Sequence, residues 1–341
     1  MTIPRQRVTL RSLAAALDVH VSTVSRVLNG TQTEARSAAS PEMIQRIREL
    51  AQSLNYRPNP QATGLRTRKT RTIGVLLPRL SDLVVATIYE GIDEAAMNHR
   101  YFTFVSSTLD DPQRQMQLGE TALARNVEGL IVGDARTDTQ TFINELAARD
   151  IPLVLVSRRA PGHCSVTCDD PKGGWIAAEH LLGQGHRDIA VLAGEPFAST
   201  GVDRTAGFLA CCAAHGISIP AQWIVHSHFD TQSGRRAGDT LLASSRKPTA
   251  IFAVNDFLAI GLMGALRDHG MRAGKDVAVI GFNDTPLAAE LPISLSSVRS
   301  PMREMGYRSL ELLLQKLDGA QPEPELLEPT LIVRASSQLR T

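Results

Sequence analysis

The stretch VTLRSLAAALDVHVSTVSRVLNG, residues 8–30, contains two short amphipathic patterns joined by a polar turn. The first pattern places four apolar residues at the i, i+3, i+4, i+7 spacing of one helix face: Leu10, Leu13, Ala14 and Leu17. Thr9 precedes this face as a helix cap, and Asp18 and Val19 form the turn. The second pattern repeats the spacing with Val21, Val24, Val27 and Leu28. Residues 8–30 therefore predict two helices joined by a tight turn.

The second of these helices carries residues that are poor helix formers in an exposed interior, because Ser22, Thr23 and Ser25 lie outside the apolar face together with Arg26. Short hydroxyl side chains and one Arg suit a helix that presses against DNA, where they can reach phosphates and base edges. The same residues also fit a surface pair of helices with no nucleic-acid partner, so alone they favour DNA only modestly.

The distribution of charge adds to this interpretation. Residues 1–72 contain 12 Lys and Arg but only four Asp and Glu, whereas the whole chain has a net charge of +1. A basic front and an acidic body indicate an anionic partner for the front alone, most plausibly a nucleic acid. A solvated charged surface would show the same bias.

Length and composition limit the class of protein. With 341 residues and 43% hydrophobic residues, the chain is long enough for two or three packed domains. No run approaches 18 apolar residues, and MTIPRQRVTLRSL lacks the apolar core of a secretion signal, so we expect a cytoplasmic protein. The four cysteines lack zinc-finger or thioredoxin spacing and are expected to be reduced and structural: Cys164, Cys168, Cys211 and Cys212.

Ser40, Pro41 and Glu42 supply an N-cap, a first-position proline and an acidic first turn, which predict a third helix through about residue 54. The polar segment before it, residues 29–39, is interpreted as a loop. Three helices would complete an α-helical helix-turn-helix headpiece over residues 1–58. A basic hinge and linker over residues 59–71 follow it.

From residue 72 onward, strand-like runs alternate with amphipathic helical segments such as residues 86–98, 112–126, 174–184 and 259–269. The strand-like runs are TIGVLLP, YFTFVSST, EGLIVG, IPLVLVS, IAVLAG, WIVHSHF, AIFAVN and VAVIGF. A βαβ series of this kind predicts parallel sheets, and its length exceeds one small core. We expect an α/β body of two doubly wound parallel-sheet lobes over residues 72–341, as in periplasmic sugar-binding proteins.

The chain resembles bacterial transcription regulators of the lactose/galactose repressor (LacI/GalR) family. Matching elements occur in family order: residues 8–30, LNYRPNPQATGLRTRKTRTIGVLLP, EHLLGQGHRDIAVLAG, DRTAGF, AIFAVNDFLAIGLMGAL, DVAVIGFNDTPLA and SSVRSPMREMG. The resemblance implies an effector-controlled, sequence-specific regulator, expected to be a repressor. It also implies a first lobe of about 72–160 plus 287–300 and a second of about 161–286 plus 301–341.

The resemblance implies that the second helix enters the major groove, with Val21, Ser22 and Arg26 as base-edge readers. Other residues expected to contact DNA are Thr9, Thr23, Ser25 and Asn29. Residues 60–66 are implied to form a hinge helix, with Ala62 near the minor-groove floor and Leu65 as an apolar wedge. The family pattern has a Ser or Thr cap where this chain has His20, a common Gly where it has Asp18, and a shorter loop than residues 30–39.

Polar residues near the carboxyl ends of the strands predict the effector site, because ligands of open α/β sheets bind there. The expected site residues are Asp82, Asp169, Thr200, Arg204, Phe229, Asn255 and Asn283. Arg204 is implied to hold hydroxyls or a carboxylate, and Asn283 replaces a frequent Asp. A neutral sugar, a sugar acid and other metabolites remain open as effectors. Asp256 and Asp284 are expected to cap a helix or turn.

The alternative functions are a sugar-binding protein without a DNA-regulatory role and an enzyme. GxxxxGK[ST], GxGxxG after a strand, HExxH and GxSxG do not occur, so we expect neither catalysis nor a cofactor. HSH at 226–228 is interpreted as a structural pair rather than a metal site. The expected partners are operator DNA, a small effector and a second copy of the chain; a homodimer is expected and a tetramer remains open. The dimer contact is hypothesised to use residues 88–97 and MRAGKD.

Overall fold

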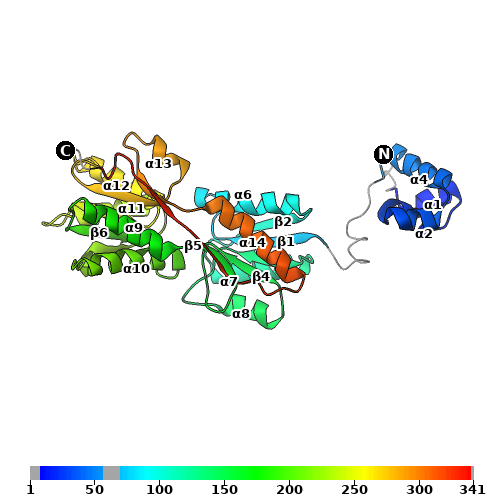
Figure 1. The fold of residues 1–341 in the computed structure, drawn as a ribbon, viewed down its shortest axis with the longest axis horizontal. Helices are drawn as coiled ribbons and strands as arrows, with labels where there is room; N and C mark the ends of the chain where they lie inside the picture. Colours follow the sequence, from blue (N-terminus) through cyan, green and yellow to red (C-terminus); the bar gives the residue numbers. More distant parts are fainter. Residues whose placement is uncertain (1–7, 57–69, 339–341) are drawn as a thin grey trace, which may run out of the picture. The chain divides into compact units, whose positions relative to one another are not determined.

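The computed structural model describes residues 8–56 and 70–338 of the chain. The chain divides into two compact units, Met1–Thr70 and Arg71–Thr341 (Figure 1). The first unit is helical in its described part, and the second unit contains two parallel sheets covered by helices. Each unit has its own hydrophobic core, so the two are described separately.

The first unit is built on the helix pair of the opening stretch, α1 (Leu10–Leu17) and α2 (Val21–Asn29), together with α4 (Pro41–Ser53). Its core contains Leu13, Val24 and Ile47, each with no exposed surface. Asp18 ends α1 in the left-handed region at φ 51°, and its backbone N–H donates to the carbonyl of Ala14. A residue with a short polar side chain can take the conformation that glycine usually supplies at this position.

The expected loop before α4 contains a further helix, α3 (Gln32–Ala38), so the interpretation of residues 29–39 as a loop was wrong. Thr31 and Glu34 form a capping box, with the Thr31 hydroxyl accepting from the Glu34 N–H at 3.2 Å. Ala35 is buried and joins the core of the unit. The T-x-x-E signal of this cap was present in the sequence, but a helix of seven residues has too few apolar residues to show a periodicity.

The second unit contains two six-stranded sheets, which we call the first and second lobes together with their helices. The first-lobe sheet has the order β11-β5-β4-β3-β1-β2 and is parallel throughout. The second-lobe sheet has the order β12-β10-β9-β8-β6-β7, and only its edge strand β12 is antiparallel to its neighbour. This arrangement confirms the predicted fold class of two doubly wound parallel-sheet lobes.

The eight strands expected from the sequence are β1 (Thr72–Leu77), β2 (Phe102–Ser107), β3 (Gly129–Val132), β4 (Leu153–Val156), β6 (Ile189–Ala193), β7 (Ile224–His226), β8 (Ala250–Ala253) and β9 (Ala278–Asn283). The others are β5 (Ser165–Cys168), β10 (Ser296–Arg299), β11 (Glu325–Leu327) and β12 (Thr330–Ile332). The helices are α6 (Leu83–Asn98), α7 (Pro112–Ala124), α8 (Thr141–Ala148), α9 (Asp170–Gly183), α10 (Ser199–Ala214), α11 (Thr231–Leu242), α12 (Asp256–Asp268), α13 (Pro286–Glu290) and α14 (Met302–Leu317), with a 3-10 turn η1 (Ala221–Trp223).

The lobe boundaries differ from those implied by the resemblance. The strand β5 pairs with β4 in the first lobe, whereas β10 pairs with β9 in the second. The chain therefore crosses between the lobes after β5, after β10 and between β11 and β12. Helix α14 packs on α6 in the first lobe, although residues 301–341 were all expected in the second.

The register of β10 against β9 buries Ser296, Ser297 and Val298. The serine-rich sequence of β10 does not indicate a buried strand.

The helices α6 and α14 approach so closely that their contact positions are glycines. A Cβ on Gly91 would lie 2.0 Å from the Arg303 carbonyl oxygen, and one on Gly306 would lie 1.9 Å from the Ile88 carbonyl oxygen. This packing buries Ile88 and Ile92 within the chain. Five of the ten residues of the segment 88–97 hypothesised for the dimer contact are therefore buried within the chain, whereas Glu90 and Met97 are exposed.

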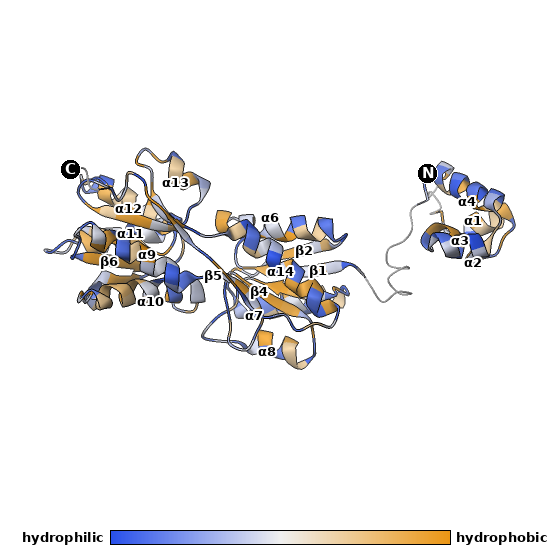
Figure 2. Cartoon of the chain, viewed as in Figure 1, coloured by the Kyte–Doolittle hydropathy of each residue, from blue (hydrophilic) through white to orange (hydrophobic). Residues whose placement is uncertain are grey.

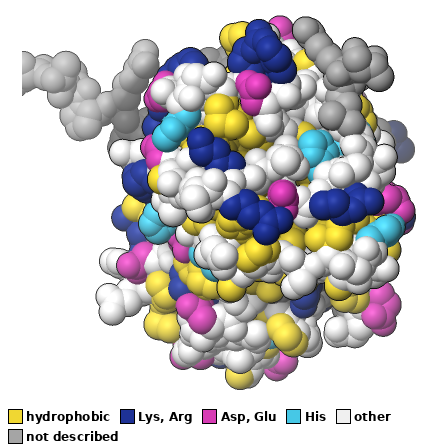
Figure 3. Space-filling view, turned by 90° about the vertical axis from the view of Figure 1, so that its left-hand side faces the viewer, with side chains coloured by type: hydrophobic (Ala, Val, Ile, Leu, Met, Phe, Trp, Pro, Cys, Tyr) yellow, Lys and Arg dark blue, Asp and Glu magenta, His cyan; other side chains and the backbone are white. Residues whose placement is uncertain are grey.

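Hydrophobic residues concentrate in the strands and on the helix faces that cover them (Figure 2). All four cysteines are free and buried, as expected for reduced structural cysteines. On the face of the second lobe that Figure 3 shows, Lys and Arg side chains lie among Asp and Glu side chains and do not form a patch of one charge. No helix in residues 8–56 and 70–338 is long and apolar enough to cross a membrane.

Candidate DNA-binding and effector-binding sites

Helix α2 buries one face and leaves the other available for contact. Val24 and Val27 are 0% and 4% exposed, whereas Ser22 and Arg26 are exposed. The other DNA-contact residues expected in the described part of the unit are exposed or partly exposed: Thr9, Val21, Thr23, Ser25 and Asn29. The spacing of the buried valines thus presents the hydroxyl side chains and Arg26 on one accessible surface, as major-groove reading requires.

The caps of the two helices already use some of these side chains. His20 caps α2, because its Nδ1 accepts from the Ser22 N–H at 3.2 Å and also lies 2.7 Å from the Ser22 hydroxyl. His20 therefore supplies the cap that a Ser or Thr provides in the family pattern. Thr9 and Ser12 form a capping box on α1, with the Thr9 hydroxyl accepting from the Ser12 N–H at 3.1 Å. The hinge residues Ala62 and Leu65 lie outside the described residues.

A cavity of about 680 Å³ lies between the two lobes of the body. Six of the seven expected effector residues line it: Asp82, Thr200, Arg204, Phe229, Asn255 and Asn283. The seventh, Asp169, does not line the cavity; it is the N-cap of α9, and its carboxylate accepts from the Lys172 N–H at 3.0 Å. The lining comes from loops that follow strands of both sheets and from the N-terminal parts of α6, α10, α11 and α12, where open α/β folds bind their ligands.

Arg204 lies in the cavity wall with most of its hydrogen-bonding capacity already in use. Its Nε donates to the Asp170 carboxylate at 2.7 Å, and its Nη1 donates to the Val254 carbonyl at 2.8 Å. The guanidinium carbon stacks 3.7 Å from the centroid of the Phe282 ring. Burial raises the pKa of Asp170 to about 6, while the charge of Arg204 opposes this rise. Asp170 belongs to the same lobe as Arg204, so the ion pair fixes the guanidinium within that lobe. Only the Nη2 group of Arg204 has no hydrogen-bond partner among the described residues.

Asn283 presents its side chain from a backbone conformation that L residues rarely adopt, at φ 99°. Its Oδ1 accepts from the Arg204 Nη1 at 3.1 Å, which leaves the Asn283 amide N–H groups for a ligand. The following residue, Asp284, also has a positive φ of 51°. Two consecutive residues of this kind require support from their surroundings.

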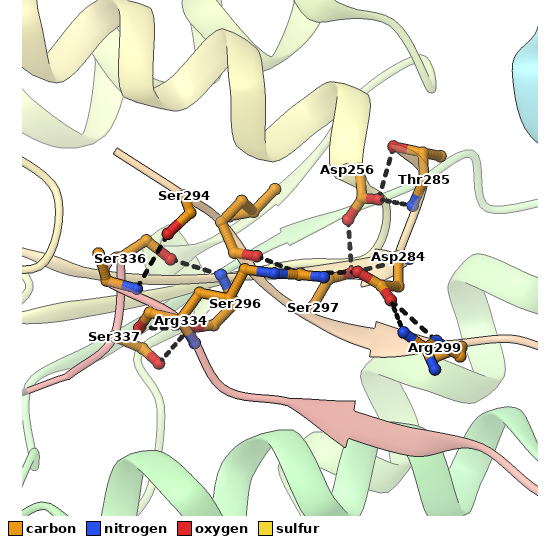
Figure 4. A network of polar contacts seen from close by, with 12 residues as sticks. Asp256, Asp284, Thr285, Ser294, Ser296, Ser297, Arg299, Arg334, Ser336 and Ser337 are labelled. Carbon is orange, nitrogen blue, oxygen red and sulfur yellow. Dashed lines mark hydrogen bonds and ion pairs between the residues drawn. The ribbon is translucent and has the colours of Figure 1, made fainter. Parts of the chain in front are cut away.

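A buried polar network supplies that support (Figure 4). The Asp284 carboxylate pairs with Arg299 at 2.8 Å and with Arg334 at 2.6 Å. The backbone N–H of Asp284 donates to the Ser297 hydroxyl. Ser297 in turn donates to Asp256 at 2.6 Å. Asp256 also accepts from the Thr285 N–H and hydroxyl. Asp256 and Asp284 therefore hold β9, β10 and the C-terminal segment together under Asn283, rather than capping a helix or turn as expected.

Asn255 is more committed than the sequence suggested. Its Oδ1 caps α12 by accepting from the Leu258 N–H at 2.8 Å, and its Nδ2 donates to the Phe229 carbonyl at 3.1 Å. These bonds fix the loop that carries the Phe229 ring into the cavity. Asp82 caps α6 through the Val84 N–H at 2.9 Å, and burial raises the pKa of this carboxyl.

The sequence did not indicate several charged and aromatic residues that line the cavity: Arg79, Asp110, Arg136, Arg158, Glu195, Phe197, His228, Asp230 and Phe257. All of them except Phe257, the second residue of α12, lie in polar loops that follow a strand, and such loops are common on any surface. Their one shared signal is a position just beyond the carboxyl end of a predicted strand.

The HSH segment is divided between the end of β7 and the following loop. His228 pairs with Glu195, and the His226 Nδ1 lies 3.2 Å from the Gly194 carbonyl oxygen. Within the residues that the structure describes, no group of three or more His, Cys, Asp and Glu side chains could hold a metal ion.

Comparison with known proteins bears on both units. Residues 9–59 match the model of bacterial regulatory proteins of the lacI family, and residues 178–337 match that of the periplasmic binding protein-like domain. The Haemophilus influenzae ribose operon repressor is 30% identical over 334 residues, covering 96% of this chain and 98% of that protein.

Among solved structures, the lac repressor dimer bound to operator and an anti-inducer superposes with a TM-score of 0.87 at 26% identity, covering 98% of this chain and 100% of that chain. The complex of the regulator CelR with cellobiose has a TM-score of 0.74 at 27% identity, covering 97% and 100%. The headpiece match contradicts the alternative of a sugar-binding protein without a DNA role. The chain therefore belongs to the LacI family of bacterial regulatory proteins, and it is a DNA-binding transcriptional regulator with an effector-binding body.

Proposed function

We propose that the protein is a repressor that binds a palindromic operator as a homodimer and that a neutral, hydroxyl-rich sugar in the cavity switches its affinity for the operator. Two identical headpieces require a two-fold symmetric site, and the solved relative bound to operator is a dimer. Arg26 and the hydroxyls of α2 would read and position the DNA. The proposal includes a cytoplasmic location, because a regulator must meet its operator DNA inside the cell.

The charged residues that line the cavity support a neutral ligand. Among the described residues that line it, the cations Arg136, Arg158 and Arg204 each have an anionic partner: Asp138, Asp110 and Asp170 respectively. The fourth, Arg79, is exposed, and its charge acts on the nearby Asp82. A ligand carboxylate would therefore compete with the existing ion pairs for the buried guanidinium groups. It would bind less tightly than it would to an unpaired cation.

The remaining groups suit a sugar. Phe229, Phe197 and Phe257 offer apolar surface for the C–H faces of a ring, while Thr200 and the amide of Asn283 offer hydrogen bonds to hydroxyls. The replacement of an Asp by Asn283 converts an acceptor of hydroxyl protons into a group that can also donate. The ribose operon repressor and the cellobiose complex among the relatives favour the same ligand class.

We also propose that the body binds its ligand without catalysing a reaction. The carboxylates of the cavity are committed to caps and ion pairs: Asp82 to α6, Asp230 to α11, Asp110 to Arg158 and Glu195 to His228. None is left as an uncommitted pair for acid–base chemistry. The named relatives are regulators, which supports the same conclusion.

A matched ligand screen tests the proposal. The melting temperature of the purified protein is measured with D-ribose and cellobiose, with the corresponding aldonic acids, and with a purine base. A neutral sugar should raise the melting temperature and change the affinity for an operator selected from random DNA. The selected operator should have two-fold symmetry. Stabilisation by the acids but not by the neutral sugars would contradict the assignment of the ligand class, and failure to select any sequence would contradict the regulatory function.

A further inference from the structure

One stretch of the second lobe, residues 196–203, contacts the first lobe away from the three crossing segments. The Thr137 N–H donates to the Phe197 carbonyl at 2.8 Å, and the Thr137 hydroxyl donates to the Pro196 carbonyl at 3.3 Å. The Arg159 N–H donates to the Ser199 hydroxyl at 3.0 Å. Thr137 and Arg159 of the first lobe are thus bonded to a continuous segment of the second.

An ion pair extends this contact. The Arg159 guanidinium donates two hydrogen bonds to the Asp203 carboxylate, at 2.9 Å from Nε and 2.8 Å from Nη2. Two parallel bonds to one carboxylate fix the orientation of both groups. The Asp203 side chain is 13% exposed, so solvent screens the pair less than a fully exposed one. Neither residue lines the effector cavity.

An aromatic contact completes the set. The guanidinium carbon of Arg136 lies 3.6 Å from the centroid of the Phe197 ring, and that of Arg158 lies 5.7 Å from it. First-lobe groups hold the edges of Arg136, because it donates to Asp138 at 2.9 and 2.6 Å and to the Asp110 carbonyl at 2.9 Å. The first lobe therefore supplies a fixed flat cation, and the second lobe supplies the ring that stacks on it.

We propose that residues 196–203 form a clasp that holds the second lobe against the first before any effector binds, with Phe197 and Asp203 as positioning residues for the effector cavity. All of these contacts are made by the protein alone and require no ligand atom. They lower the free energy of the closed arrangement of the lobes relative to an open one. The effector then meets a cavity that is closed on this side, and its apparent affinity depends on the closed fraction.

The size of the effect follows from the contacts. Loss of the stacked pair is expected to shift the ratio of open to closed molecules by roughly 2- to 30-fold toward the open form. Loss of the Asp203 ion pair is expected to shift it by roughly 1.4- to 5-fold. Because Asp203 does not line the cavity, an effect of its replacement on ligand binding is expected to act through the position of the lobes.

The distance between the lobes in the effector-free, full-length protein tests the clasp. Spin labels are placed on cysteines introduced at Gln113 of α7 and Gln232 of α11, both exposed, while the native cysteines are buried. Labelled chains are diluted with unlabelled ones so that only distances within one chain are measured. The unaltered clasp should give one dominant distance. Phe197→Ala and Asp203→Asn should each raise the ratio of the longer-distance to the dominant population by the factors given above.

Two matched variants control for general effects. Glu120→Gln breaks an exposed ion pair with Arg149 inside the first lobe, and Phe104→Ala removes a ring 5.6 Å from the Arg125 guanidinium in the same lobe. Both should keep the dominant distance. Distances in Phe197→Ala and Asp203→Asn that match the unaltered protein would overturn the proposal, as would equal opening in the controls. The measurement uses no effector or DNA, so its failure would leave the proposed function intact.

Discussion

Replacing Arg204 with Met should leave the Asp170 carboxyl buried without its cation. Both side chains are 5% exposed and are joined at 2.7 Å. Met keeps an unbranched apolar chain that can remain in contact with the Phe282 ring. Removing one partner of a buried pair typically costs about 3–5 kcal/mol of folding free energy. We expect Arg204→Met to lose stability in that range near neutral pH, in addition to its effect on the ligand.

The loss of stability in Arg204→Met should grow as the pH rises, because of the titration of Asp170. Burial raises the pKa of Asp170 to about 6 with Arg204 present, and loss of the guanidinium raises it further. Above pH 6 the folded variant therefore keeps a proton that the unaltered folded protein and both unfolded chains have released. Folding of the variant then takes up a proton, so its stability falls relative to the unaltered protein as the pH rises. While that proton is retained, the difference grows by about 2.3 kcal/mol between pH 6 and pH 8, because Asp170 of the unaltered protein is still half protonated at pH 6.

Urea unfolding followed by tryptophan fluorescence measures this difference directly. Trp175 lies in α9 and Trp223 in the turn before β7, so both report on the second lobe that contains the pair. The cycle is completed with Asp170→Asn and the double variant. In the Asp170→Asn background, replacing Arg204 should give a loss that no longer grows above pH 6, because the titrating group is absent.

A loss of stability that is equal at pH 6 and pH 8 would refute the assignment of a buried, coupled pair. So would equal losses from Arg204→Met in the presence and absence of the Asp170 carboxylate. In either case Arg204 would be free to act on the ligand as an unpaired cation, and the argument for a neutral effector would lose its main support.

Further predictions concern the headpiece and the helix packing of the second lobe. Arg26→Ala should weaken binding to the selected operator by about 1–3 kcal/mol while reducing binding to random DNA far less, as measured by titration at fixed salt. Ala35→Glu should destabilise the headpiece by about 1–3 kcal/mol in thermal unfolding, because it introduces a charge into the site where α3 joins the core. Gly174→Ala should destabilise the second lobe in urea, since its Cβ would lie 2.0 Å from the Arg204 carbonyl oxygen, whereas Gly183→Ala, with nothing within 4 Å, should be neutral or stabilising.

The helix-turn-helix pair could be predicted because its signals are local. Apolar spacing over eight or nine residues, a hydroxyl cap and a short turn are all visible within residues 8–30. The same reasoning found eight strands of the body, where runs of buried aliphatic residues are bounded by loops. It missed α3, because a helix of seven residues with one buried alanine shows no periodicity.

The effector site could be predicted only in part. Arg204, Asn255 and Asn283 follow motifs of the family and lie in the cavity wall. Arg204 is committed to Asp170 and Asn283, and Asn255 to Phe229. These contacts depend on which strands become neighbours, and the sequence does not encode them over short range. Asp169 was placed in the site because it follows a strand, but its carboxylate is used as a helix cap.

By itself, the sequence determined the kinds of elements, their order and the charged front of the chain, since these depend on propensities and spacing within a few residues. Only the tertiary structure decided how the lobes divide the chain, because the pairing of β5 and β10 is a choice between sheets of similar sequence character. It also decided that Phe197 meets Arg136 across the cavity. These residues are separated by three strands and two helices and come together only when both sheets have formed.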